Sequence, residues 1–167
     1  MDIFAHSLWS MVLLPGPPSV EKVALGIAPD ILVFATSLTK QAIKGKMQPG
    51  FKTRKEMMDW YHRPENKWVL NFYKWTHSLV IWIALIIPTF FIWIQLTGNI
   101  PWFLLAAPIH ILMDIPTHNN NSFPVQFLTP LSKFKVNGMH WSKPIVFIGN
   151  YILIIAAFYF RMFVIGK

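Results

Sequence analysis

Six ionisable side chains lie inside or at the edge of apolar segments, where an unpaired charge is costly. They are His6, Asp30, His77, His110, Asp114 and His118. Imidazole nitrogens and carboxylate oxygens are ligands for zinc, and also for iron or manganese. The chain has no cysteine, so it offers a metal no thiolate. This set predicts a shared polar cavity that holds a divalent metal ion, with zinc as the first choice.

His110 and Asp114 carry the most specific part of this pattern. Residues four apart lie one turn apart on one stripe of a helix, so both side chains can reach the same ion. His118 would extend the stripe, but Pro116 disfavours helix at Ile115 and places His118 on the following turn. Taken alone, the pair could also be a structural hydrogen bond in a bundle interior. The six groups together favour the shared cavity.

A bound divalent ion would lower the pKa of a coordinated water and polarise an ester or phosphoryl oxygen. Asp30 is expected to bind the ion and to take part in catalysis, and His118 to complete the ligand shell or to shuttle a proton.

Substrate contacts are expected from residues near the ends of the apolar segments. The candidates are Lys74, Ser78, Asn119 and His140. Lys74 could hold a phosphate. His140 could instead be an interfacial side chain, and Asn119 could belong to a turn that stops a helix.

The elements that must position these residues are predicted to be membrane helices. Hydrophobic residues make up 54% of the chain and charged residues only 13%, a balance that a water-soluble globule of 167 residues would struggle to cover with polar surface. We expect an all-α fold, a small polytopic membrane bundle of three to four spans forming a single domain over 1–167. Membrane helices are expected at 77–96, 101–116 and 144–165.

The remaining segments are assigned from the distribution of charged residues and from the glycine and proline residues that interrupt helices. Residues 1–39 should form N-terminal helical segments interrupted near 26–30, as a hairpin or re-entrant pair. Residues 40–76 should be a basic cytoplasmic loop with an interfacial helix. Nine of the fifteen Lys and Arg residues lie between Lys40 and Lys74. This distribution follows the positive-inside rule and favours membrane lipids over nucleic acid as neighbours.

The order of these motifs resembles a known family. The elements are His6 in an N-terminal helix, Pro29-Asp30, Thr76-His77-Ser78, and His110, Asp114, Thr117 and His118 in a His-x-x-x-Asp-x-x-Thr-His pattern. They look like the YdjM-like membrane-bound, metal-dependent hydrolases, whose ligand pattern is similar to that of zinc-dependent phospholipase C. The resemblance implies a metal site built from His6, Asp30, His77, His110 and Asp114.

The expected function is therefore metal-dependent hydrolysis of an ester or phosphoester, with a lipid as the expected substrate, in a multi-pass protein of a bacterial inner membrane. The alternative is a non-catalytic subunit or scaffold of a membrane assembly, with protein partners or further copies of itself and a structural or vestigial metal site. Ion transport is a third interpretation, and a few short spans in one copy leave little room for a pathway.

Overall fold

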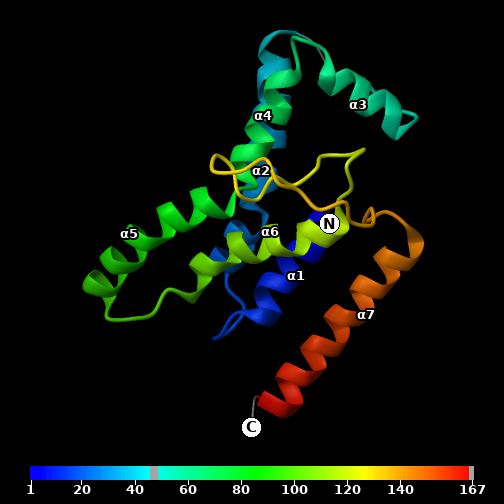
Figure 1. Cartoon of the computed structure of the whole chain (residues 1–167). Helices are drawn as coiled ribbons and strands as arrows, with labels where there is room; N and C mark the ends of the chain where they lie inside the picture. Colours follow the sequence, from blue (N-terminus) through cyan, green and yellow to red (C-terminus); the bar gives the residue numbers. More distant parts are fainter. Residues whose placement is uncertain (46–48, 166–167) are drawn as a thin grey trace.

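The computed structural model describes residues 1–45 and 49–165, which fold into helices joined by turns and one long irregular segment (Figure 1). No β-strand occurs in these residues, so the all-α prediction is confirmed. In chain order the elements are α1 (Ile3–Leu13), α2 (Val20–Ile43), α3 (Arg54–His62), α4 (Lys67–Thr76), α5 (Leu79–Thr97), the 3-10 helix η1 (Trp102–Leu105), α6 (Ala106–Thr117), α7 (Pro144–Phe160) and the π-helical turn η2 (Arg161–Ile165).

Side-chain caps fix where several helices begin. Each capping oxygen accepts a backbone N–H of the first turn. The caps are Asp2 for α1, Ser19 for α2, Thr53 for α3 and Ser78 for α5. Because Ser78 starts α5 directly after the end of α4, His77 is held at the junction of these two helices.

Helix α2 runs without interruption through Pro29, so the predicted break near 26–30 is wrong. Pro29 has no N–H to donate. Helices α6 and α1 both pack on this stretch. The Gly26 carbonyl accepts a hydrogen bond from His110 Nδ1 on α6 at 2.7 Å. Helix α1 lies so close that a Cβ on Gly26 would be 2.1 Å from Ser10 Oγ. Packing from both sides holds the helix together where local sequence alone suggests a break.

The segment 40–76, predicted as a loop with one helix, contains the end of α2 and two helices, α3 and α4. Residues 46–48 of this segment lie outside the described part. Helix α3 is supported by its Thr53 cap and by an ion pair between Lys55 and Asp59 one turn apart, at 2.7 Å. Helix α4 buries Val69 and Tyr73 on one face. Five of the basic residues in this segment therefore lie on helices, namely Lys40, Arg54, Lys55, Lys67 and Lys74, whereas Lys44, Lys52 and Arg63 lie in the turns between them.

Two apolar cores hold the helices together. The first joins α2, α3, α4 and α6 around Val33, Tyr61, Tyr73 and Ile111. The second joins α1 to α7 around Trp9 and Ile154. Helix α2 contacts α1, α4 and α6, so it is the element that links both cores.

Two cations close the turn after α1. Lys22 Nζ donates to the carbonyls of Pro15 and Pro17 at 2.8 and 2.7 Å, and Arg161 Nη1 donates to the carbonyl of Leu14 at 2.6 Å. Carbonyls at a helix C-terminus have no partner within the helix and carry partial negative charge, so cations stabilise them. Arg161, at the end of α7, therefore binds the C-terminal end of α1.

Three helices are long and apolar enough to cross a membrane: α2, α5 and the helix from Pro144 to Phe163. No residue of α5 is buried, and of α7 only Ile154 is. The segment 101–116 differs from its prediction as a membrane helix. It forms η1 and α6, a shorter apolar helix that buries His110, Ile111 and Asp114 and packs against α1, α2 and α5. It is a core element of the bundle.

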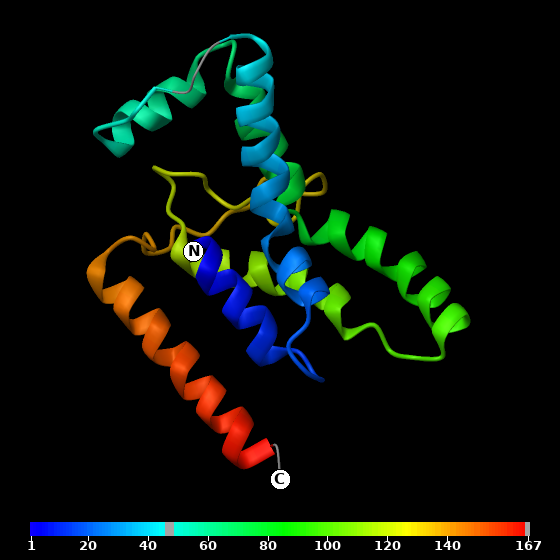
Figure 2. The same cartoon turned by 180° about the vertical axis from the view of Figure 1, so that it is seen from behind.

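The arrangement of the helices separates two sides of the molecule. Helices α1 and α7 extend to one side of α6, whereas α3 and α4 lie on the opposite side, together with the C-terminal half of α2, and α5 runs beside α6 (Figures 1 and 2). The start of α1 lies beside the C-terminal end of α6 and near the start of α7 in both views.

Candidate metal centre

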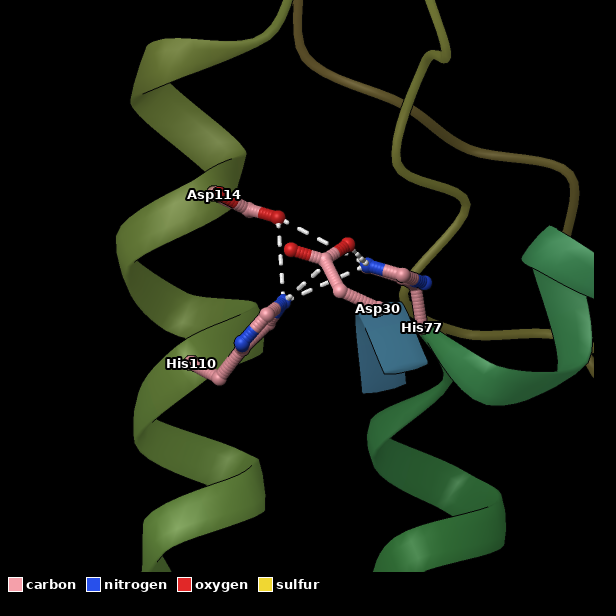
Figure 3. A group of neighbouring side chains, drawn as sticks. All are labelled: Asp30, His77, His110 and Asp114. Carbon is pink, nitrogen blue, oxygen red and sulfur yellow. Dashed lines mark hydrogen bonds and ion pairs between the residues drawn. The ribbon is translucent and has the colours of Figure 1, made fainter. Parts of the chain in front are cut away.

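Four of the six predicted residues come together between three parts of the fold (Figure 3). Asp30 comes from the middle of α2, His77 from the junction of α4 and α5, and His110 and Asp114 from one face of α6. Each offers one ligand atom, and these four atoms all lie within 4.8 Å of one another. His77, His110 and Asp114 are buried, whereas the Asp30 side chain is 18% exposed.

The spacing of these atoms suits a small divalent cation. His77 Nε2 lies 3.3 Å from His110 Nε2 and 3.3 Å from Asp30 Oδ1, and His110 Nε2 lies 3.3 Å from Asp114 Oδ2. Ligands about 2.0–2.1 Å from a tetrahedral zinc ion are about 3.3–3.4 Å apart. Two further distances are longer, 3.6 Å from His77 Nε2 to Asp114 Oδ2 and 3.9 Å from His110 Nε2 to Asp30 Oδ1.

Hydrogen bonds to the backbone fix which ring nitrogen faces the centre. His77 Nδ1 donates to the Tyr73 carbonyl at 3.2 Å, and His110 Nδ1 donates to the Gly26 carbonyl at 2.7 Å. With the proton on Nδ1, each neutral ring presents the lone pair of Nε2. Two lone pairs that face each other at 3.3 Å repel unless a cation lies between them, and anchoring of Nδ1 on a carbonyl is the usual support of a metal-binding histidine.

His6 and His118 lie around the other oxygen of Asp114. His6 Nε2 is 3.1 Å and His118 Nδ1 is 3.4 Å from Asp114 Oδ1, and the backbone nitrogen of Met1 contacts the same oxygen. The His6 ring stacks on His110 with 3.5 Å between ring centroids. Asp114 thus directs Oδ2 to the four-residue group and Oδ1 to a second group of nitrogens. His6 is adjacent to the predicted ligands and outside the group of four.

Burial favours the neutral form of His77 and His118. Desolvation lowers the pKa of His77, an effect that Asp30 partly opposes. Desolvation also lowers the pKa of His118 to about 4, although Asp114 opposes it. His118 Nδ1 lies 3.1 Å from the Asp114 carbonyl and can donate a hydrogen bond to it. In that tautomer, Nε2 is free to accept a proton. Neutral imidazole is the form that binds a metal ion.

A cavity of about 480 Å³ adjoins the centre. Asp30, His118 and His140 line it, so three predicted site residues share one space. The end of α6 helps to build it: the backbone N–H groups of Gly138 and Trp141 donate to the carbonyls of His118 and Thr117 at 2.8 and 2.9 Å. This pairing brings His140 beside His118, with 6.4 Å between ring centroids.

The other predicted substrate contacts lie elsewhere. Ser78 Oγ caps α5 and donates to the Thr129 carbonyl, so its hydrogen bonds are already made within the fold. Asn119 accepts from the backbone N–H of Asn121 at 3.1 Å, the geometry of a turn. Lys74 lines a second cavity of about 310 Å³, which does not include the metal-binding group. None of these three residues lines the cavity beside the four-residue group, and their contact with a substrate stays a prediction.

Residues that the sequence did not single out also line the cavity of the centre. Tyr73 stacks on His77 with 3.7 Å between ring centroids and is 3% exposed. Arg54 and Ser142 close the outer side, where Arg54 Nη2 donates to Ser142 Oγ at 2.7 Å. Tyr73 and His77 are four residues apart, a spacing that places two side chains next to each other on a helix. Assigning residues 67–76 to a helix would therefore have predicted the contact between Tyr73 and His77.

Comparisons with known proteins add no relative to this description. No family model, curated protein or solved structure matches the chain. The resemblance to the YdjM-like hydrolases therefore stays a prediction, which the order of the motifs supports.

Proposed function

We propose that this protein is a membrane-embedded, metal-dependent hydrolase that cleaves an ester or phosphoester, with a membrane lipid as its substrate. The observation that carries the proposal is the pair of Nε2 atoms of His77 and His110, 3.3 Å apart with their lone pairs directed at each other and at two carboxylates. A divalent cation between the four groups would remove the repulsion between the lone pairs, with both histidines neutral and both carboxylates ionised.

Asp30, His77, His110 and Asp114 would hold the ion, and zinc is the first choice for two nitrogens and two oxygens. When bound, such an ion lowers the pKa of a coordinated water and polarises an ester or phosphoryl oxygen. Asp30 lines the cavity and is the most exposed of the four, so substrate would approach on its side. His118 lines the same cavity, and its Nε2 can take up or return a proton.

The position of the site favours a lipid substrate. His77 directly precedes the cap of α5, and His140 lies four residues before α7 begins at Pro144. If α5 and α7 cross the membrane, the cavity lies at the level where their apolar surfaces begin, which is the level of lipid head groups. The basic residues between Lys40 and Lys74 would place this face on the cytoplasmic side of a bacterial inner membrane.

The test compares wild type with Asp114→Asn in two measurements, the metal content of the purified protein and the release of head groups from mixed lipid vesicles. Asp59→Asn is the matched control, because Asp59 is an exposed carboxylate on α3 whose one ion pair within residues 1–45 and 49–165 is with Lys55. We expect wild type and the control to bind metal and release head groups, and Asp114→Asn to lose both. Absence of metal and of any difference between the three proteins would contradict the proposal.

Metal binding without turnover would support the alternative, a non-catalytic subunit with a structural metal. The unburied surface of α5 is the feature that such a role would use, since it leaves room for a protein partner as well as for lipid. Co-purification of a stoichiometric partner would accompany that result.

A further inference from the structure

The cavity beside the metal centre is closed on its outer side by a chain of hydrogen-bond donors. Arg54 donates to Ser142 Oγ at 2.7 Å, and Ser142 Oγ lies 2.9 Å from His140 Nδ1. Because the backbone N–H of Ser142 also donates to this Nδ1, at 3.1 Å, the nitrogen has no proton of its own. The proton of the neutral His140 ring is therefore on Nε2, which has no hydrogen-bond partner among the described residues.

Tyr73 supplies a second donor without a partner. Its side chain lines the same cavity and is 3% exposed, and its hydroxyl has no hydrogen-bond partner in the described part of the chain. A buried hydroxyl without a partner costs free energy, so such groups in native proteins usually serve a ligand or bind water. The stacking of the Tyr73 ring on His77 places this hydroxyl next to the metal-binding group.

The lining of the cavity has an excess of donors and positive charge. Lys52 and Arg54 both line it, and the one acidic side chain among its described lining residues is Asp30, which belongs to the metal-binding group. A lining with more donors and cations than acceptors fits a ligand that offers acceptors and negative charge. Phosphate has this character, and arginine is the side chain best suited to bind it.

We propose that this cavity is a phosphate-binding subsite in which Arg54, the Nε2–H of His140 and the Tyr73 hydroxyl donate to the oxygens of a phosphate group. Aromatic residues on the same wall, among them Phe34, Phe51 and Trp141, would contact the carbon part of an organic phosphate. The inference rests on the proposed function, because the phosphate would be the part of the substrate that is held beside the metal centre during hydrolysis.

The experiment measures the affinity of the purified protein for inorganic phosphate, in zinc-loaded and metal-free forms, by titration calorimetry. Arg54→Gln and Tyr73→Phe are compared with Arg63→Gln and Tyr159→Phe, which change the same residue types at positions that line neither this cavity nor the second one. We expect each cavity variant to weaken phosphate binding by about tenfold, the loss typical of one hydrogen bond to a charged group, with zinc content unchanged. The control variants should bind as wild type does.

A second arm replaces inorganic phosphate with short-chain phosphatidic acid. Tighter binding of the lipid, with the same dependence on Arg54 and Tyr73, identifies a lipid head group as the ligand, and equal or weaker binding identifies free phosphate. Phosphate affinity that is unchanged in both cavity variants would overturn the subsite, as would acetate binding in place of phosphate. The subsite stands and the hydrolase proposal falls if the protein binds no metal yet loses phosphate affinity in both variants.

Discussion

His110 shows how one side chain can join the fold and the site. Its Nδ1 donates to the Gly26 carbonyl on α2, and its Nε2 faces His77 and Asp114. The same hydrogen bond therefore links α6 to α2 and selects the tautomer that can bind a metal. His77 repeats the arrangement on the carbonyl of Tyr73, one turn earlier in its own helix. Both rings are oriented before any ion arrives, which lowers the entropic cost of binding it.

At the residue scale, replacing His77 tests the ligand assignment. His77→Ala should lower zinc affinity by more than about a hundredfold, because a ligand bond is lost, and even the loss of a supporting hydrogen bond costs about ten- to a hundredfold. His62→Ala is the matched control, since His62 is exposed at the end of α3 and its one hydrogen bond in the described part of the chain is to the Met58 carbonyl. Competition with a fluorescent zinc chelator measures both. Equal affinities of the two variants would contradict the assignment.

His140 gives a prediction about pH. Its pKa is lowered from 6.5 to about 4, chiefly by burial, with smaller contributions from the nearby Arg54, His118 and Lys143. Between pH 6.5 and 4 the unfolded chain binds more protons at this residue than the folded chain, so the stability that the neutral ring contributes is lost as pH falls through this window. NMR titration of His140 in the metal-free protein should give a pKa well below 6.5.

Arg54→Gln should raise this pKa toward 6.5, because it removes a positive charge beside the ring. Arg63→Gln, at the far end of α3, should leave it unchanged. A wild-type pKa of 6.5 or above would show that His140 is neither buried nor beside Arg54 in solution.

At the scale of elements, close contacts between helices position the site. Gly26 is where α1, α2 and α6 meet, because Ser10 on α1 occupies the space of a Cβ and His110 on α6 takes the carbonyl. Gly138 has a similar role at the end of α6: a Cβ there would lie 2.2 Å from the Pro116 carbonyl oxygen. The absence of a side chain at each position permits the backbone approach that brings His110 and His140 into the site.

Gly26→Ala should therefore destabilise the protein by about 1–3 kcal/mol, the usual cost of overpacking, and should weaken zinc binding through His110. Gly149→Ala on α7 is the matched control, since a Cβ there meets no atom within 4 Å. Thermal unfolding in detergent, followed by circular dichroism, measures both. A melting temperature of Gly26→Ala equal to that of the control would contradict the close packing of α1 on α2.

At the scale of the whole molecule, the exposed apolar side chains and the basic helices α3 and α4 lie on different elements. Large exposed apolar side chains are concentrated on α5 and α7, including Ile87, Phe91 and Leu153. Helices α3 and α4, which carry the basic residues Arg54, Lys55, Lys67 and Lys74, lie on one side of α6 together with the C-terminal half of α2 (Figure 1). This division supports burial of α5 and α7 in lipid with the metal centre near the boundary.

The absence of cysteine makes this arrangement simple to test by labelling. Ile87→Cys, in the middle of α5, should be protected from a membrane-impermeant maleimide in intact vesicles, because lipid would surround it. Lys55→Cys on α3 should react when its side of the membrane is accessible, and both should react after detergent unfolding. Rapid labelling of Ile87→Cys in intact vesicles would show that α5 does not cross the membrane.

Composition and spacing were enough to predict the helical class, the long apolar helices α5 and α7, and the grouping of four of the five candidate ligands, with His6 beside them. These candidates could be found because an ionisable group among apolar residues is costly wherever it lies, so its presence alone suggests a function. The four-residue spacing of His110 and Asp114 added geometry, since both lie on one stripe of α6.

Tertiary contacts decided the rest. The continuity of α2 through Pro29 depends on α1 and α6, which the local sequence of 26–30 does not include. The roles of Ser78 and Lys74 depend on which surfaces meet, and so does the place of Arg54 and Tyr73 in the cavity. A sequence determines the chemistry and the cost of each side chain, but which side chains become neighbours depends on packing between residues far apart in the chain, and only the folded arrangement of helices settles that.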